Sequence, residues 1–164
     1  MDIARFERAV SLRDTGQPAE AAQEFHALAG EAADPIERGM ILLNESTALC
    51  ESGDTAAARE RWMEACSLIP EDSDFRPSIE VQEDSILVAE DRTEEAIEIP
   101  DRIAAKYGSR LADSERRDLY ERIQISRGSH LVYLGRFSEA RPLFEEALSF
   151  DESMKDARST TTLV

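Results

Sequence analysis

The sequence predicts an all-α protein, and three observations lead to this prediction. The first is composition: Ala, Glu, Arg and Leu, which lose little on entering a helix, dominate the 164 residues, whereas Gly occurs 7 times and Pro 6 times. The second is the scarcity of β-branched runs, which are typical of strands. The third is an internal repeat, in which four segments share one pattern of small and aromatic residues. Together they favour a stack of helical hairpins.

Each repeat starts at a turn residue and continues with an alanine five positions later; three of the four also have an aromatic residue four positions beyond that alanine. The turn residues are Gly16, Gly53, Asp91 and Gly135, and the alanines are Ala21, Ala58, Ala96 and Ala140, separated by 37, 38 and 44 residues. A glycine at the turn supplies the left-handed or open backbone that ends one helix. The alanine lets two helices approach closely. Because one hairpin cannot bury its apolar face alone, neighbouring hairpins must stack.

Four hairpins are expected in order along the chain. They cover residues 2–31, 36–70, 75–107 and 113–150. The second helices of the first two hairpins begin near Pro18 and Thr55, which suit first-turn or N-cap positions. The expected organisation is therefore a single repeat domain over 1–151, followed by a C-terminal tail or partial capping helix over 152–164.

The third and fourth hairpins depart from the first two. Pro100 replaces the aromatic residue, and a proline inside a helix removes a hydrogen bond, so we expect a bent or broken helix over 94–107 that ends at Gly108. In the fourth hairpin, Asp113-Ser114 has the form of an N-cap. A helix of about 20 residues from there to Leu134 accounts for the longer final spacing.

Two of the segments carry a fuller set of small and large residues. The second has Leu49, Gly53, Ala58, Trp62, Ala65, Leu68 and Pro70, and the fourth has Gly128, Leu131, Gly135, Phe137, Ala140, Phe144, Ala147 and Leu148. With these residues the chain resembles the tetratricopeptide repeat (TPR) family over nearly its whole length, although the family period is shorter, about 34 residues. The resemblance implies a right-handed solenoid of about four antiparallel helical hairpins. It also implies a protein-interaction scaffold whose concave groove holds a peptide or helix of a partner protein.

The resemblance places the groove on the first helix of each hairpin. Matched by position, the groove residues are Met40, Leu43, Asn44, Thr47 and Glu51, then Ser78, Val81, Gln82 and Ser85, then Arg122, Ile125, Ser126 and Ser129. Asn44 matches the family asparagine that binds a peptide backbone or terminal carboxylate. Ser78 and Gln82 stand where chaperone-binding members have basic residues, which counts against a C-terminal chaperone peptide. The alternative is that all of these are ordinary helix-face residues.

The sequence predicts no enzyme, cofactor or metal site. His26 and His130 are over a hundred residues apart, and Cys50 and Cys66 lack metal-ligand spacing. No phosphate-binding loop, nucleophile elbow or zinc-protease motif is present. The acidic residues between Asp72 and Asp84 lack the alternating ligands and central glycine of a calcium loop. We therefore expect no catalytic residues.

Charge and cysteine content bear on partners and location. The formal net charge is −16, and residues 71–101 hold 12 acidic and 2 basic residues, whereas 102–135 hold 4 and 7. Such a charge disfavours nucleic acid and anionic membranes. The acidic block is interpreted as a solvated face or as a site for a basic partner protein or peptide. With no secretory start, no long apolar run and two cysteines interpreted as reduced, we expect a cytoplasmic protein, and 17 Arg against 2 Lys hints at a bacterial one.

An alternative to partner binding in the groove stays open. The thin C-terminal cap and the opposed charges of 71–101 and 102–135 are also consistent with self-assembly into a homo-oligomer, or with a docking segment of a larger regulatory protein. Fold alone does not separate these hypotheses.

Overall fold

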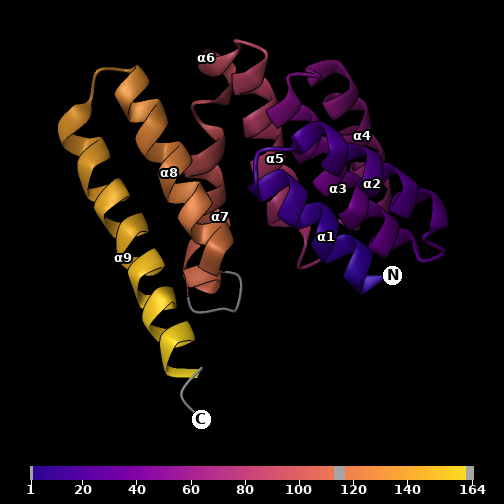
Figure 1. Ribbon diagram of the computed structural model, residues 1–164. Coiled ribbons are helices and arrows are strands. Elements are labelled where there is room, and N and C mark those ends of the chain that lie inside the picture. Colours follow the sequence, from indigo (N-terminus) through magenta and orange to yellow (C-terminus); the bar gives the residue numbers. More distant parts are fainter. Residues whose placement is uncertain (1, 113–116, 162–164) are drawn as a thin grey trace. The chain divides into compact units, whose positions relative to one another are not determined.

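The structure is a computed structural model that describes residues 2–112 and 117–161, and in these ranges it consists of helices joined by turns, with no strand (Figure 1). The helices are α1 (Ile3–Asp14), α2 (Pro18–Glu31), α3 (Pro35–Ser52), α4 (Thr55–Leu68), α5 (Arg76–Ala89), α6 (Thr93–Ala96), α7 (Ile99–Ala112), α8 (Arg117–Tyr133) and α9 (Phe137–Thr161). The predicted all-α class is confirmed. None of the helices in these ranges combines the length and the apolarity needed to cross a lipid bilayer.

The chain divides into two compact units. Unit 1, Met1–Ala96, contains α1 to α6, and unit 2, Ile97–Val164, contains α7 to α9. In unit 1, helices adjacent in sequence pack on one another from α1 to α6, and α5 also packs on α3. In unit 2, α8 packs on both α7 and α9, and Figure 1 shows α8 and α9 as an antiparallel hairpin.

Four turns have the same backbone conformation. The backbone φ is +82° at Gly16, +89° at Gly53, +59° at Asp91 and +75° at Gly135. At each of these residues the amide donates to the carbonyl three residues earlier, and the next amide donates to the carbonyl five residues earlier. This pair of bonds is the Schellman motif, which satisfies the last carbonyls of a helix. The residue that accepts the longer bond is a leucine every time: Leu12, Leu49, Leu87 and Leu131. The predicted turn residues are confirmed at all four positions.

Small residues mark the places where paired helices cross. The repeat alanines are 0% exposed at Ala21, Ala58 and Ala96 and 1% exposed at Ala140. Twelve positions before each of them stands another buried residue: Ala9, Ser46, Asp84 and Gly128. The Ser46 hydroxyl donates to the carbonyl of Ala58 at 2.8 Å, so α3 and α4 lie in contact at that level. A Cβ on Gly128 would lie 2.7 Å from the Phe144 ring, so α8 and α9 also meet closely there.

The core of unit 1 runs between α1 and α5. Phe25 is fully buried, and its ring meets the ring of Phe6 edge-on at 5.5 Å. Ile41 and Ile79 are each 1% exposed, and the Trp62 indole donates to the carbonyl of Ile79 at 2.9 Å. Each fully buried side chain of this size stabilises the fold by about 1.5–3 kcal/mol.

The third hairpin is broken where the sequence predicted, but it ends later. α6 stops at Ala96 and α7 starts at Ile99, which places Pro100 in the first turn of a helix, where its missing N–H is not needed. The predicted end at Gly108 is wrong, because α7 continues to Ala112. Gly108 is buried inside α7, and a Cβ there would make an ordinary van der Waals contact with the Tyr120 ring at 3.7 Å, so this glycine neither ends the helix nor is required by the packing of α8.

The last hairpin follows the predicted long helix in its described part. α8 covers Arg117–Tyr133, and the predicted N-cap at Asp113-Ser114 lies outside the residues that the structure describes. α9 continues as one helix to Thr161 and so includes most of the predicted tail, whose last three residues also lie outside the described part.

Candidate partner-binding site

The predicted groove residues of the second hairpin lie on α3. Met40, Asn44 and Thr47 are half-buried, and Glu51 is exposed; their spacing puts all four on one side of the helix. The Asn44 amide donates to the carbonyl of Met40 at 2.9 Å, which fixes its side chain along the helix. Leu43 is only 9% exposed and belongs to the core. The α3 stripe, Met40-Asn44-Thr47-Glu51, is thus a mixed surface of polar and apolar groups.

The predicted residues of the third hairpin lie on α5, beside this stripe. Gln82 is 1% exposed, and its side-chain oxygen accepts from the Thr47 hydroxyl at 2.9 Å. Its amide donates to the Ser46 hydroxyl at 3.2 Å, so Gln82 joins α5 to α3 from inside the unit. Val81 is buried as well, whereas Ser78 and Ser85 are half-buried. The structure therefore brings the α3 and α5 residues together, with Gln82 between them.

The predicted residues of the fourth hairpin lie in unit 2. Arg122, Ile125 and Ser129 are exposed and Ser126 is half-buried, and their spacing places them on one face of α8. The Ser129 hydroxyl donates to the carbonyl of Ile125 in its own helix at 2.9 Å. This α8 face is a surface of unit 2.

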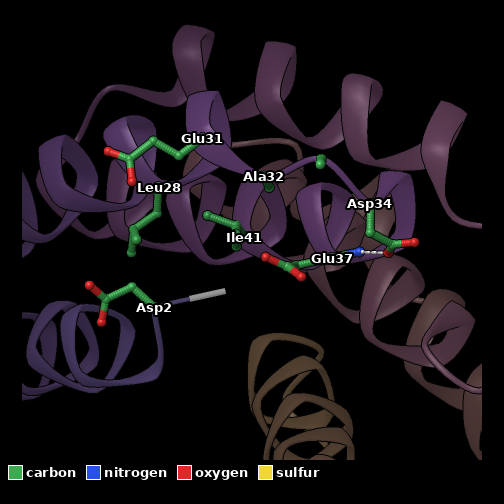
Figure 2. A pocket seen from close by; sticks show the side chains of 8 residues that line it. Asp2, Leu28, Glu31, Ala32, Asp34, Glu37 and Ile41 are labelled. Atoms are coloured by element: carbon green, nitrogen blue, oxygen red, sulfur yellow. Dashed lines mark hydrogen bonds between the residues drawn. The ribbon is translucent and has the colours of Figure 1, made fainter.

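A hollow of about 360 Å³ opens at one end of unit 1. It lies where the start of α1, the end of α2 and the start of α3 come together (Figure 2). Its lining residues are Asp2, Leu28, Glu31, Ala32, Ala33, Asp34, Glu37 and Ile41. Its volume lies at the lower end of the range of small-molecule sites.

The hollow combines an apolar floor with an acidic rim. Leu28 and Ile41 are 3% and 1% exposed, and the lining includes four carboxylates but no Arg, Lys or His. Asp2 accepts from the backbone amide of Arg5 at 3.1 Å, and Asp34 accepts from that of Glu37 at 2.7 Å. Both therefore cap a helix start, and such capping fixes the direction of the side chain.

Glu31 supplies a third fixed carboxylate at the rim of the hollow. Both of its oxygens accept from the Arg5 guanidinium at 2.9 Å. An apolar floor under carboxylates suits a lysine or arginine side chain, whose carbon stem and charged head have different preferences.

The hollow was not predicted from the sequence, although the sequence contains a signal for it. Asp2 precedes Ile3 and Asp34 precedes Pro35, and an Asp before a helix start is a typical N-cap. In a hairpin repeat, the starts of α1 and α3 lie at the same end as the end of α2. The two caps and the acid at the end of α2 should therefore meet.

A buried carboxylate joins three helices of unit 1. Glu45 of α3 is 4% exposed; one of its oxygens lies 3.0 Å from Nδ1 of His26 on α2 and 3.9 Å from Nε of Arg61 on α4. The other oxygen is buried without a hydrogen-bond partner. Burial raises the pKa of the Glu45 carboxyl. Burying the charged carboxylate lowers the stability of the fold, whereas its contact with His26 links α3 to α2.

The cysteines lie in surroundings that keep them protonated. Burial raises the pKa of the Cys50 thiol to about 11 and also raises the pKa of the Cys66 thiol. A thiol is nucleophilic only as the thiolate. In the part of the chain that the structure describes, no three His, Cys, Asp or Glu side chains are grouped so as to hold a metal ion.

No family model, no curated protein and no solved structure matches this chain. The repeated hairpins and the surfaces they carry are therefore the basis on which a function is proposed.

Proposed function

We propose that this chain is a TPR-like helical-repeat scaffold that binds a segment of a partner protein on unit 1. The observation that carries the proposal is the repetition itself: four turns with the same two backbone hydrogen bonds, each followed by a buried alanine five residues later. Stacked helical hairpins form extended concave surfaces, and such surfaces are used for binding. The finer architecture of the proposal is the right-handed solenoid of about four antiparallel hairpins that the TPR resemblance implies.

The α3 stripe is the proposed contact surface for the backbone of the partner segment. Asn44 is held along α3 by its bond to Met40, so its amide is ordered before binding. Thr47 is held by Gln82 of the neighbouring helix at 2.9 Å. Polar groups that are already fixed lose little entropy when they bind a ligand. Glu51 extends the same stripe into solvent.

The proposed partner segment is basic. Unit 1 holds 23 acidic and 8 basic residues, a formal net charge of −15, whereas unit 2 holds 12 and 11, a net charge of −1. The hollow concentrates four of the acids of unit 1 over an apolar floor. Opposite charges speed association and select partners, and their effect falls with added salt. A lysine or arginine of the partner segment would fill the hollow.

The charge of the hollow can be tested by capture from the native cell lysate with rising salt. The variant Glu31→Gln/Glu37→Gln removes two charges from the rim, and Glu20→Gln/Glu60→Gln removes two exposed charges elsewhere in unit 1. We expect the first variant to lose affinity on the order of tenfold, or about 1.4 kcal/mol, and to elute at lower salt. The second should elute with the unmodified protein. Equal elution of both variants would contradict the role of the hollow.

The α3 stripe needs a separate test. A photoreactive residue at Glu51 reports what lies on the stripe, and the same residue at exposed Ala27 of α2 is its control. We expect a discrete protein to be cross-linked from position 51 and not from position 27, with a lower yield after Asn44→Ala. Identical adducts from both positions would overturn the stripe as the binding surface.

A further inference from the structure

α9 has one covered face and one open face. Ala140 and Ala147 are 1% and 2% exposed on the side that packs on α8. Phe137 and Leu148 are 65% and 63% exposed, and the side chain of Arg141 is 80% exposed. These three residues share one side of the helix with Phe144, which is half-buried. We call this side the α9 stripe: Phe137-Arg141-Phe144-Leu148.

The same positions on α2 are covered by the next helix. Counted from the turn residues Gly16 and Gly135, Ala22 corresponds to Arg141 and Ala29 corresponds to Leu148. Ala22 and Ala29 are 5% and 4% exposed, and α2 packs on α3. In the first hairpin this side of the second helix is therefore an interface with the following helix.

The same positions on α4 contact the following helix, α5, through hydrogen bonds of named side chains. Arg59 corresponds to Arg141, and its guanidinium forms two hydrogen bonds of 2.7 and 2.6 Å to the carboxylate of Glu90, which directly follows α5. The hydrogen bonds from Arg59 hold the pKa of the Glu90 carboxyl below its usual value. Trp62 corresponds to Phe144 and donates to the carbonyl of Ile79 in α5 at 2.9 Å.

From this correspondence we propose that the α9 stripe docks an amphipathic helix of a partner protein that carries an acidic residue in its last turn. Arg141 repeats the arginine that receives Glu90, Phe144 repeats the aromatic residue under the helix, and Leu148 adds an exposed apolar contact. At present Arg141 pairs with Glu145 at 2.7 Å. An exposed ion pair four residues apart on a helix contributes little to stability, so its exchange for a partner carboxylate costs little.

A second copy of this chain fits the stripe less well than a separate partner. In a head-to-tail stack, the incoming helix would be α1, the first helix of the repeat. Thr15 occupies the α1 position that corresponds to Glu90, and the acid in the last turn of α1, Asp14, already pairs with Arg13 of the same helix at 3.1 Å. The proposed occupant is therefore a helix of another protein, with apolar residues on one side and a C-terminal acid.

The proposal can be tested with the full chain and a displayed library of 16-residue helical peptides, depleted first on a Leu148→Glu variant. We expect the selected peptides to be amphipathic and to carry Asp or Glu in the last turn. Their binding should fall by more than tenfold on Leu148→Glu and remain unchanged on Met63→Glu, which alters an exposed apolar residue of α4. Circular dichroism confirms that both variants keep their helix content.

A charge exchange makes the test specific for Arg141. The variant Arg141→Glu should lose the selected peptides and bind versions whose C-terminal acid is replaced by lysine. Selection of no peptide, equal binding to the Leu148→Glu and Met63→Glu variants, or no effect of the charge exchange would each overturn the proposal. Glu31→Gln/Glu37→Gln should not alter this binding, so a failure of the α9 proposal is distinguishable from a failure of the proposed binding at the hollow.

Discussion

Glu45 leads to a prediction about the pH dependence of stability. Because its pKa is raised in the folded state above the ordinary value of 4.5, the folded protein keeps this proton to higher pH than the unfolded chain does. The contribution of Glu45 is therefore fully present below pH 4.5 and is lost as the pH rises through the raised pKa. We expect Glu45→Gln to increase the free energy of unfolding at pH 7 by on the order of 1 kcal/mol and to flatten its decline with pH.

Urea denaturation at a series of pH values measures this effect. Glu7→Gln, which removes the same charge from an exposed position on α1, is the matched control and should change little. A Glu45→Gln variant that is less stable than the Glu7→Gln variant at pH 7, with an unchanged pH profile, would show that the link to His26 outweighs the burial of the charge.

The close contact of α8 and α9 at Gly128 leads to a prediction about stability. A Cβ at this position would lie 2.7 Å from the Phe144 ring, so Gly128→Ala should destabilise the protein by about 1–3 kcal/mol. Gly30→Ala is the control: no neighbouring atom lies within 4 Å of a Cβ there, and alanine is the better helix former, so we expect a gain of about 0.5–1 kcal/mol. Thermal unfolding of both variants tests the prediction. A further Phe144→Leu change should restore part of the loss at Gly128.

At the scale of elements, the four turns provide a comparison within one chain. Three have glycine at the left-handed position, and the third has Asp91 with a φ of +59°. A residue with a Cβ is disfavoured there by about 1–2 kcal/mol, although Asp tolerates this region better than most. We expect Asp91→Gly to raise the melting temperature and Gly53→Ala, at a φ of +89°, to lower it. If Asp91→Gly instead lowered it, contacts of the Asp91 side chain would outweigh the backbone strain.

The helices show which parts of the fold could be predicted from the sequence. The turn residues and repeat alanines were recognisable because local backbone geometry and close helix contact each require one kind of residue, and the break before Pro100 follows from a missing N–H. The end of α7 was mispredicted because a glycine ends a helix only where the backbone turns left-handed, whereas Gly108 is buried inside a continuous helix, and tertiary context overrides its weak helix propensity.

The candidate site was less accessible to the same reasoning. Spacing placed Asn44 and Thr47 on one side of α3, but it did not reveal that Gln82 lies between two helices and bonds to both Thr47 and Ser46. That burial depends on the approach of α5 to α3, which periodicity does not specify. The hollow likewise arises where three separate helix ends meet.

At the scale of the whole molecule, charge is divided unevenly between the two units. Unit 1 has a formal net charge of −15 and unit 2 a net charge of −1. The open α9 stripe belongs to the nearly neutral unit, and the acidic hollow belongs to the charged one. The two proposed surfaces therefore differ in chemistry, and salt should weaken binding at the hollow more than docking of an amphipathic helix on α9, where apolar contacts supplement a single ion pair.

Unit 1 is also expected to fold by itself. In a repeat array each hairpin depends mainly on its neighbours, so stability is close to a sum of local and nearest-neighbour contributions. A fragment of residues 1–96 keeps every helix from α1 to α6, including the bonds from Gln82 to α3 and from Arg59 to Glu90. We expect it to be helical and to unfold in one cooperative urea transition.

A shorter fragment of residues 1–74 tests the reason for that stability. It loses α5, so Trp62 loses its carbonyl partner on Ile79 and the apolar side of α4 becomes exposed. Its urea midpoint should lie clearly below that of the longer fragment, because the lost contacts include a buried polar network as well as apolar area. An unfolded 1–96 fragment would show that unit 1 requires the rest of the chain. Equal midpoints for the two fragments would show that the following helix adds little. The α9 docking proposal assumes that a following helix stabilises the side of the preceding helix that it covers. The difference between the two urea midpoints measures the strength of such an interface within this chain.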